Sequence, residues 1–263
     1  MNKSEQAVPV TVPKRKRRTQ NRQHLPVLPF FLAGVILIFC LIYNISRGAG
    51  TPVTQASAVG APDQATQAVM SQEDPSAWYL TLVNPWNPIP EGYEVDLAQL
   101  EDGHAVDERC YPYLKEMLKA CQAEGLSPVV CSSYRSQAKQ ERLYQNQVKT
   151  YKSRGYSSET AKIEAAKAVA IPGTSEHQLG LAVDIVDLGN QNLDKSQENT
   201  PVQKWLMENS WRYGFILRYP NEKSETTGII YEPWHYRYVG KDVAKKLYEQ
   251  NICLEEYLAQ LQA

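Results

Sequence analysis

A run of 19 residues without a formal charge, residues 25–43, divides this chain into a short front end and a long remainder. At about 1.5 Å per residue, a helix of this length just crosses a hydrocarbon core of about 30 Å. A basic cluster, residues 14–18, precedes the run, and cationic flanks stay on the cytoplasmic side of a membrane. The sequence therefore predicts a basic cytoplasmic tail (1–24), a single transmembrane anchor (25–43) and an extracytoplasmic remainder.

Other interpretations of the apolar run are weaker. A buried core helix would not normally follow a basic tail interrupted by prolines. A cleaved signal peptide is compatible with the small residues Ala56-Ser57-Ala58, but these lie well beyond the run, which is also long for a signal sequence. A lipoprotein box ending at Cys40 is disfavoured by the bulky Phe39 before it. We therefore favour an uncleaved anchor.

Charge is distributed unevenly along the chain. Residues 1–48 hold eight Lys or Arg and one acid, whereas the other 215 residues hold 20 bases and 28 acids, a net charge of −8. This balance disfavours nucleic acid as a partner of the whole chain. The basic cluster alone could suggest a nucleic-acid patch, but membrane topology explains it better, because it borders an apolar run.

A linker and one folded domain are predicted after the anchor. Residues 44–77 are expected to be flexible, because from residue 48 onward they almost lack large apolar side chains and cannot offset the entropy of ordering. From residue 78 to 263 the composition becomes globular, with all five Trp and most of the 16 Tyr. About 186 residues can form one substantial core.

Hydrophobic periodicity and turn residues predict the secondary structure of this domain. Helices are expected at residues 113–123, 137–152, 158–169, 201–213, 241–249 and 254–261. Short strands are expected at residues 128–131, 181–186, 215–217, 229–230 and 234–238. Short strands mixed irregularly with helices indicate an α+β fold, with a small antiparallel sheet and flanking helices.

Four cysteines lie in the predicted domain: Cys110, Cys121, Cys131 and Cys253. Three disulfide pairings are open, and so is a set of free, buried thiols. No CxxC motif is present, which argues against a structural zinc site built from thiolates.

Two of the four histidines have informative neighbours, whereas His24 and His104 are interpreted as surface residues. His177 follows a turn-forming stretch, and a predicted strand after it carries Asp184. The neighbours of Asp184 on its face of that strand are apolar, and burying a lone carboxylate is costly without a cation or hydrogen-bond donors. A metal ion shared by His177 and Asp184 would meet this need.

The second informative segment is Glu232-Pro233-Trp234-His235. Three residues of extended strand span about 10 Å, so Glu232 would reach the site of His235 only through the bend that Pro233 favours. Two His and one Asp make a zinc shell with an open position for water, whose pKa zinc lowers from about 15.7 towards 7. Glu232 could then take the proton of that water. A purely structural interpretation stays open, because single His and Asp residues are often structural.

The stretches SEHQLGLAVD and EPWH together closely resemble the VanY-like D-alanyl-D-alanine carboxypeptidases, zinc peptidases related in fold to the hedgehog-type domain. A third block, Ser132-Ser133-Tyr134-Arg135 with Gln140 beyond it, is similar to the Arg-containing strand-to-helix segment of that family. The resemblance covers about residues 79–250, with the blocks in the expected order.

The resemblance implies one Zn²⁺ per domain, bound by His177, Asp184 and His235. It makes Glu232 the general base and then the general acid. It places Arg135 beside the substrate carbonyl or carboxylate, where a fixed cation stabilises developing negative charge. The structural alternative for Arg135 is a surface ion pair, which would contribute little.

The resemblance also implies substrate contacts by Ser175 and Gln140, although loop Ser and helix Gln are more often simply solvated. Ser133 stands where many relatives have Gly, which predicts a local difference in the backbone.

The predicted function is removal of the C-terminal D-alanine from peptidoglycan stem peptides by a zinc carboxypeptidase in a bacterial cell membrane, with its catalytic domain extracytoplasmic. The alternatives are an L,D-carboxypeptidase acting on tetrapeptide stems, a D,D-dipeptidase, a stem-peptide endopeptidase and a non-catalytic, zinc-stabilised wall-binding domain. The anchor disfavours a dipeptidase acting on free D-Ala-D-Ala. Glu232 and Arg135 disfavour the non-catalytic domain, because a structural metal site needs neither.

Overall fold

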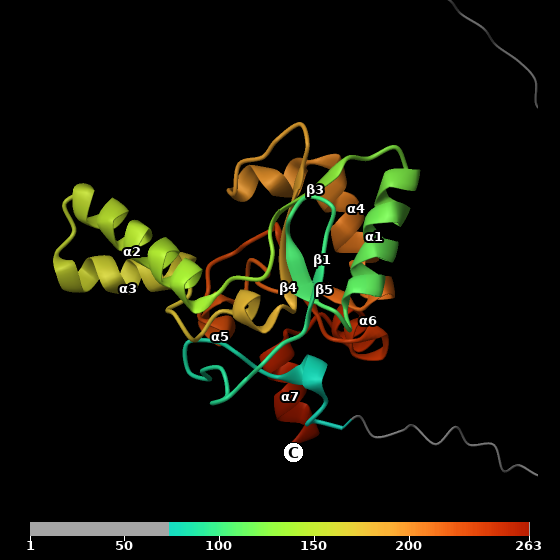
Figure 1. Ribbon diagram of the computed structural model, residues 1–263, viewed down its shortest axis with the longest axis horizontal. Helices are drawn as coiled ribbons and strands as arrows, with labels where there is room; N and C mark the ends of the chain where they lie inside the picture. Colours follow the sequence, from blue (N-terminus) through green and yellow to red (C-terminus); the bar gives the residue numbers. More distant parts are fainter. Residues whose placement is uncertain (1–73, 263) are drawn as a thin grey trace, which may run out of the picture. The chain divides into compact units, whose positions relative to one another are not determined.

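The computed structural model describes residues 74–262. The predicted tail (1–24), the predicted anchor (25–43) and nearly all of the predicted linker (44–77) lie outside the described residues. Within residues 74–262, no helix has the length and apolar character needed to cross a membrane. These residues form an α+β domain with small antiparallel sheets and flanking helices, as predicted (Figure 1).

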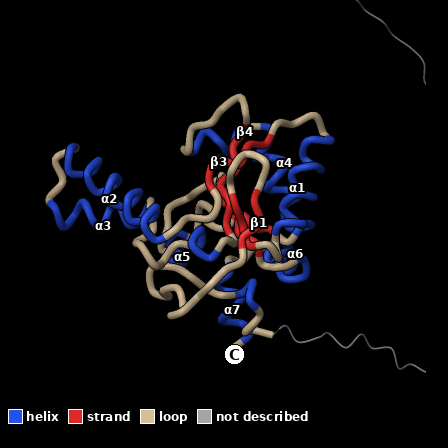
Figure 2. The backbone as a smooth tube through the Cα atoms, in the orientation of Figure 1, coloured by secondary structure: helices blue, strands red, loops and turns tan. Residues whose placement is uncertain are grey.

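A four-stranded antiparallel sheet lies at the centre of the domain (Figure 2). Its spatial order is β3 (Pro128–Ser132), β4 (Ala182–Asp187), β6 (His235–Tyr238) and β5 (Phe215–Leu217). A separate antiparallel pair consists of β1 (Leu97–Gln99) and β2 (Ala105–Asp107). The sequence pattern does not predict β1 and β2, because three residues are too few to show a recognisable alternation.

Helices surround the sheet and account for most of the remaining regular structure. The α-helices of the described residues are α1 (Tyr111–Ala123), α2 (Gln137–Ser153), α3 (Ser158–Ala168), α4 (Pro201–Asn209), α5 (Ser224–Thr227), α6 (Lys241–Gln250) and α7 (Leu254–Leu261). Short 3₁₀ segments are η1 (Trp78–Leu80), η2 (Glu176–Leu179), η3 (Lys195–Asn199) and η4 (Ser210–Tyr213).

Capping residues set several of these helix starts. The hydroxyl oxygens of Ser136, Ser157 and Thr200 each accept a hydrogen bond from a backbone N–H in the first turn of α2, α3 and α4, respectively. Such caps satisfy an otherwise unpaired donor and typically contribute about 1 kcal/mol. Pro201 occupies the first turn of α4, where its missing N–H costs nothing. The predicted starts of α3 and α4 are therefore confirmed.

One predicted strand is wrong, and one predicted helix changes its type before its predicted end. Residues 229–230 form no strand: Gly228, with φ of +77°, ends α5, and the Ile230 N–H donates to the Lys167 carbonyl at the end of α3. The predicted helix 201–213 is α-helical only to Asn209 and continues as η4, where Gly214 ends it with φ of +83°. In both places a glycine in the left-handed region ends the helix that precedes it.

One face of the central sheet lies in the main core, and the opposite face, called the polar face below, carries charged side chains among apolar ones. Val183 and Ile185 of β4 pack in the main core with side chains of α1 and α4 on that side: Leu114, Met117, Val202 and Leu206. Each such side chain contributes roughly 1.5–3 kcal/mol by its burial. Asp184, between Val183 and Ile185, points to the opposite face. The same alternation along β6 brings His235 and Arg237 to that polar face.

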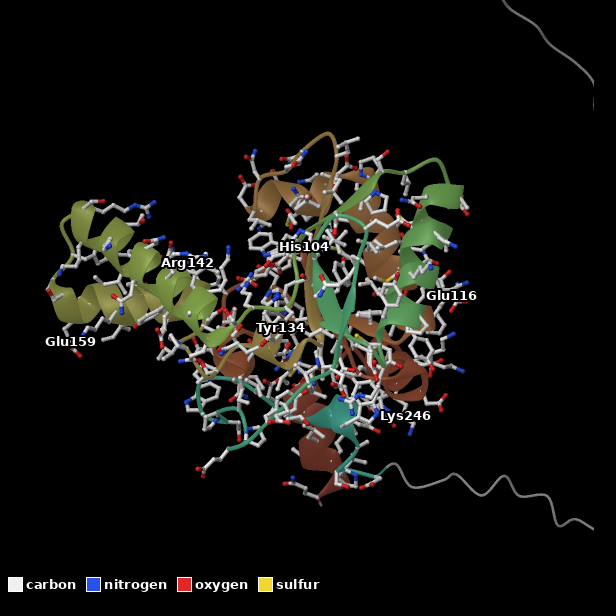
Figure 3. All side chains as sticks on the ribbon, viewed as in Figure 1. His104, Glu116, Tyr134, Arg142, Glu159 and Lys246 are labelled. Carbon is white, nitrogen blue, oxygen red and sulfur yellow. The ribbon has the colours of Figure 1, made fainter. Side chains whose placement is uncertain are left out.

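Helices α2 and α3 pack together through a small apolar cluster of their own, made of Val148, Ala161 and Ala165. The pair extends away from the central sheet (Figure 1). Arg142 on α2 and Glu159 on α3 are exposed and carry charge on the outer surface (Figure 3). Three other side chains of α2, Leu143, Gln147 and Tyr151, line the cleft that is described below.

The four cysteines of the described residues are free. Cys110, Cys121 and Cys253 are buried. Burial raises the pKa of Cys110 to about 12 and that of Cys253 to about 11, so these thiols stay protonated at neutral pH. The sequence left open either disulfides or free, buried thiols. In the structure the four thiols are free, and they pack as small apolar side chains.

A left-handed conformation costs an alanine about 1–2 kcal/mol. Gly180→Ala is expected to lower the free energy of unfolding by more than this amount. Gly180 ends η2 with φ of +74°, and a Cβ there would lie 2.9 Å from the backbone nitrogen of Asp107. Gly125→Ala is the matched control, because Gly125 has φ of +76° but nothing within 4 Å of a Cβ. Urea unfolding would measure both free energies of unfolding. Equal losses would contradict the steric argument.

Candidate active site

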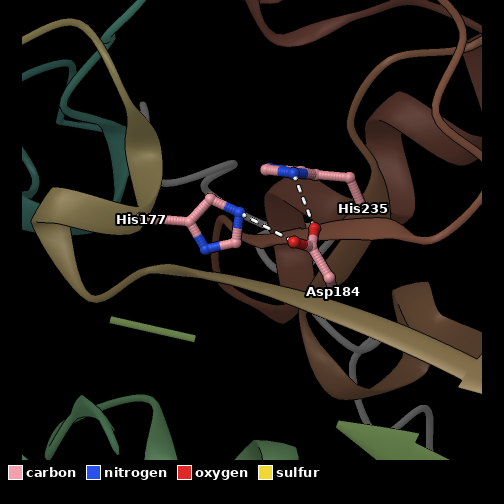
Figure 4. Close-up of side chains that lie close together, drawn as sticks. All are labelled: His177, Asp184 and His235. Atoms are coloured by element: carbon pink, nitrogen blue, oxygen red, sulfur yellow. Dashed lines mark ion pairs between the residues drawn. The ribbon is translucent and has the colours of Figure 1, made fainter. Parts of the chain in front are cut away.

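Three elements bring the predicted metal ligands together (Figure 4). His177 lies on η2, Asp184 on β4 and His235 at the start of β6. Asp184 and His235 are direct partners in the antiparallel β4–β6 pair. One potential ligand atom from each of the three buried side chains lies within 4.8 Å of the others. The sequence separates these residues by up to 58 positions, and the sheet register closes that gap.

A tight turn places the Glu232 side chain beside the cluster of His177, Asp184 and His235. The His235 N–H donates to the Glu232 carbonyl at 3.2 Å, which closes a turn with Pro233 in its second position. Proline favours that position because its φ is already suitable. The turn leaves Glu232 Oε2 3.5 Å from His235 Nδ1, and Glu232 is only 8% exposed. The predicted bend is confirmed.

A backbone carbonyl orients His177. Its Nδ1 atom lies 2.9 Å from the Ser133 carbonyl oxygen, which can only accept, so Nδ1 carries the proton. Nε2 then presents its lone pair to the cluster, 3.3 Å from Asp184 Oδ2. The Ser133 hydroxyl accepts from the Ala105 N–H and contacts His104 Nδ1 at 3.1 Å. His104, expected at the surface, is therefore partly buried and supports the loop that orients His177.

Arg135 is fixed against the cluster. Its Nη2 atom donates to Asp184 Oδ2 at 2.8 Å, and its Nε and Nη2 atoms donate to Ser132 Oγ at 3.0 and 2.7 Å. The β3–β4 register shifts between Val130 and Ser132, an irregularity that commonly re-aims a strand near a functional site. Arg135 is therefore no surface ion pair: its side chain is 15% exposed and held at the edge of the cleft.

The two predicted substrate contacts occupy different positions. Ser175 is buried and lines the cleft just before η2. Gln140 is fully buried and holds Arg135: its Oε1 accepts from Arg135 Nη1 at 3.4 Å, and its Nε2 donates to the Ala170 carbonyl at 2.7 Å. Both ends of the Gln140 amide are engaged within the protein, so the structure gives it a role behind Arg135, and its contact with a substrate stays a prediction.

The cluster lies on the floor of a cleft of about 440 Å³. Polar side chains of its lining are Arg135, Gln147, Ser175, His177, Asp184, Tyr219, Glu232 and His235. Its apolar lining comes from α2 and from the segments that follow α3 and α5, and includes Leu143, Tyr151, Val169, Ile229, Ile230 and Trp234. A cleft with convergent polar groups and apolar walls is the usual form of a small-ligand site.

Burial and neighbouring charges shift the pKa values of the two histidines in opposite directions. Burial, helped by the Arg135 guanidinium, lowers the pKa of His177 to about 4, so its imidazole is neutral. Burial also acts to lower the pKa of His235, but the neighbouring carboxylates of Asp184, Glu176 and Glu232 outweigh it and raise this pKa to about 9. His235 therefore lies where negative charge gathers and a cation is favoured.

Burial raises the pKa of Glu232 to about 8, although the neighbouring His235 opposes the shift. A carboxyl group with a proton affinity near neutral pH suits general acid–base work. A dication bound beside it would favour the carboxylate and lower this pKa, which leaves Glu232 ready to accept a proton.

The residues present fit a zinc ion. Asp184 Oδ1 is buried and makes no hydrogen bond within the described residues, although it lies only 3.1 Å from His235 Nδ1. These two atoms therefore face each other in the buried site, as two ligand atoms of one metal ion would. Two imidazoles and one carboxylate are a ligand set typical of catalytic zinc, which keeps a fourth position open.

Sequence reasoning missed three buried charged residues next to the cluster: Glu176, Arg218 and Arg237. Glu176 falls inside the SEHQLG stretch, but no spacing signal in the sequence gives it a role. Arg218 and Arg237 lie far from it in the chain, and only the folded sheet brings their guanidinium groups to its carboxylate.

Comparisons with known proteins agree with this geometry. The profile of the VanY family, described as D-alanyl-D-alanine carboxypeptidase, matches residues 103–241. A D-alanyl-D-alanine carboxypeptidase from Enterococcus faecalis is 49% identical over 212 residues, covering 80% of this chain and 75% of the relative. A putative carboxypeptidase, YodJ, from Bacillus subtilis is 37% identical over 189 residues, covering 68% of this chain and 66% of the relative.

Solved structures resemble the domain as well. VanYB in complex with D-alanine-D-alanine is 51% identical, with a TM-score of 0.65, and the match covers 69% of this chain and 98% of that one. A variant of a vancomycin-resistance D,D-pentapeptidase VanY in complex with Zn(II) is 51% identical, with a TM-score of 0.64, covering 69% and 99%. The LdcB LD-carboxypeptidase is 35% identical, with a TM-score of 0.57, covering 68% and 84%.

Proposed function

Because the chain belongs to the VanY family of D-alanyl-D-alanine carboxypeptidases, we propose that it is a zinc peptidase that removes the C-terminal D-alanine from peptidoglycan stem peptides. The observation that carries this proposal is the convergence of His177, Asp184 and His235 on the cleft floor, with Glu232 and Arg135 beside them. The relatives add support, since VanYB was solved with D-alanine-D-alanine and VanY with Zn(II).

When bound, zinc supplies a water of lowered pKa and polarises the scissile carbonyl. The protein supplies proton transfer. Glu232 lies beside the ligand cluster, accepts a proton on its carboxylate and returns it to the leaving amino group of D-alanine. The apolar walls of the cleft keep the reacting groups away from bulk water, which strengthens the local electrostatic interactions.

Arg135 supplies a fixed positive charge. Ser132, Gln140 and Asp184 hold its guanidinium at the cleft edge, so no reorganisation is needed when the substrate binds. In that position it can pair with the oxygen that becomes negative during attack or with the terminal carboxylate of the peptide. Ser175 on the same cleft wall is a candidate partner for the terminal part of the substrate.

Arg135→Lys is expected to lower kcat/KM about 10²-fold, because an ammonium group cannot reproduce the fork that bonds Ser132 and Asp184. Arg142→Lys is the matched control on the exposed side of α2 and should behave as the wild type. Release of D-alanine from a pentapeptide would be measured for both, together with zinc content. An Arg135→Lys variant with wild-type kcat/KM would contradict the proposed role.

Substrate choice can be tested directly with purified full-length protein. We expect stem pentapeptides that end in D-Ala-D-Ala to lose one alanine, which mass spectrometry would detect. The reason is that the D,D-pentapeptidase VanY and VanYB are each 51% identical to this chain, whereas the LD-carboxypeptidase LdcB is 35% identical. Loss of alanine only from tetrapeptides would reassign the enzyme to L,D specificity. Release of a dipeptide or internal cleavage would indicate a dipeptidase or an endopeptidase.

We further propose that residues 25–43 anchor the protein in the bacterial cell membrane with its catalytic domain outside the cytoplasm. The uncharged run and the basic cluster before it support this proposal. In intact cells, protease added from outside should degrade the catalytic domain after removal of the wall, and alkaline carbonate should not extract the protein. Extraction by carbonate, or protection from the protease, would contradict it.

A further inference from the structure

Glu176 is a buried carboxylate that the mechanism above does not use. It lies on η2 between Ser175 and His177, and its side chain has no exposed surface. Its Oε1 atom accepts from Arg218 Nε at 2.7 Å and from Arg237 Nη1 at 2.8 Å. Two guanidinium donors on one oxygen make strong, charge-assisted hydrogen bonds and hold the carboxylate in one orientation.

The two arginines are themselves held by the two ends of the domain. Arg218 pairs with Glu255 of α7 through Nη1–Oε2 at 2.8 Å and Nη2–Oε1 at 2.6 Å. Arg237 donates from Nη2 to the carbonyl oxygens of Tyr79 and Thr81, at 3.1 and 2.9 Å. Neither guanidinium is free to turn, so the carboxylate between them is fixed as well.

The second oxygen of Glu176 faces His235. Oε2 lies 3.6 Å from His235 Nε2, which is beyond hydrogen-bond distance. Both atoms are buried, and within the described residues neither has a hydrogen-bond partner. A carboxylate that served only to neutralise arginines would offer both oxygens to them. Here one oxygen is kept for the imidazole nitrogen that faces away from the ligand cluster.

We propose that Glu176 is a positioning residue: its negative Oε2 faces His235 Nε2, favours the tautomer that is protonated on that nitrogen and thereby leaves the Nδ1 lone pair for zinc. Nδ1 is the nitrogen that faces the cluster, 3.1 Å from Asp184 Oδ1. His177 has the opposite arrangement, because its Nδ1 bonds the Ser133 carbonyl and its Nε2 faces the cluster. The proposal rests on the zinc site proposed above and adds the carboxylate that orients His235 from behind.

Nitrogen-15 NMR of histidine-labelled, zinc-loaded wild-type protein tests this arrangement without any variant. We expect one zinc-bound histidine protonated on Nδ1 and one protonated on Nε2. Two zinc-bound histidines protonated on Nδ1 would overturn the proposal. The measurement requires bound zinc but no turnover, so a protein that shows both tautomers yet cleaves no stem peptide would contradict the proposed substrate and still support the role of Glu176.

Zinc affinity, measured by competition with a chromophoric chelator, gives a second test. Glu176→Gln is expected to weaken zinc binding about 10–100-fold, because the neutral amide cannot accept from the arginines and present a negative oxygen to His235 Nε2 at the same time. Glu256→Gln is the matched control: it also removes a partly buried carboxylate from an ion pair, with Lys223 at 2.8 Å, but that pair includes neither a zinc ligand nor an arginine bound to Glu176, and its zinc affinity should equal that of the wild type. Equal losses in the two variants, or no loss in Glu176→Gln, would overturn the proposal. If Glu176→Gln does not fold, the NMR result on the wild type decides.

Discussion

Glu232→Gln is expected to lower kcat about 10³-fold while the protein keeps its zinc, because general acid–base catalysis typically contributes about 10²–10⁴-fold. The amide has nearly the shape of the carboxylate and preserves the turn, since the Glu232 contribution to that turn is its backbone carbonyl. It cannot accept a proton from the attacking water or return one to the leaving amine. Glu232 belongs to the turn before β6 and only approaches His235, at 3.5 Å, so its loss leaves the three ligands in place.

Two measurements together check this expectation. Release of D-alanine from a pentapeptide gives kcat, and metal analysis of the same samples gives zinc content. Glu225→Gln, on the exposed side of α5, is the control for removal of a nearby negative charge and should retain full activity. A Glu232→Gln variant that loses zinc and activity in parallel would show that Glu232 supports the metal site and is not the proton shuttle.

Removal of zinc should abolish activity and weaken the fold. The cluster gathers the carboxylates of Asp184 and Glu232 beside two imidazoles in a buried site. Arg135 is the fixed positive charge next to Asp184, and a bound dication would balance the remaining negative charge. Zinc present at about 100–1,000 times its dissociation constant would stabilise the folded state by about 3–4 kcal/mol through linkage. Chelation should remove that stabilisation together with all measurable D-alanine release, and added zinc should restore both.

The variant Asp184→Asn tests whether zinc binding depends on the Asp184 carboxylate. The amide keeps the size of the side chain but removes the charge that pairs with Arg135 at 2.8 Å and faces both histidines. Added zinc should raise the melting temperature of the wild type and leave that of Asp184→Asn unchanged. A zinc-dependent rise of the same size in the variant would exclude Asp184 as a ligand. Continued D-alanine release in excess chelator would exclude zinc catalysis altogether.

Local sequence signals predicted much of the site because each acts over a few residues. Pro233 predicted the bend that carries Glu232 to His235, and the turn before His177 was equally visible in the sequence. Alternation along β4 predicted that Asp184 would be buried among apolar neighbours, and a buried carboxylate needs a cation. The caps at Ser157 and Thr200 gave the starts of α3 and α4 in the same way, since capping depends only on adjacent residues.

Errors arose where the outcome depends on partners distant in the chain. The sequence pattern of residues 229–230 predicts a strand, yet the Ile230 N–H bonds to Lys167 at the end of α3. The substrate contact of Gln140 stays a prediction, but no sequence signal indicated that its amide would be engaged by Arg135 and Ala170. Strands β1 and β2 exist only as a pair, because neither is long enough to be recognised alone.

The sequence by itself determined which residue types are available for the proposed chemistry: the residues of the proposed zinc cluster, the proposed acid–base Glu232 and the α+β class follow from motifs, turns, periodicity and family resemblance. Only the tertiary structure decided the orientation of those groups. The β4–β6 register sets Asp184 opposite His235, and the Arg218 and Arg237 pair turns the Glu176 carboxylate towards that imidazole. Such contacts join segments far apart in the chain, and long-range pairing depends on packing that no local pattern encodes.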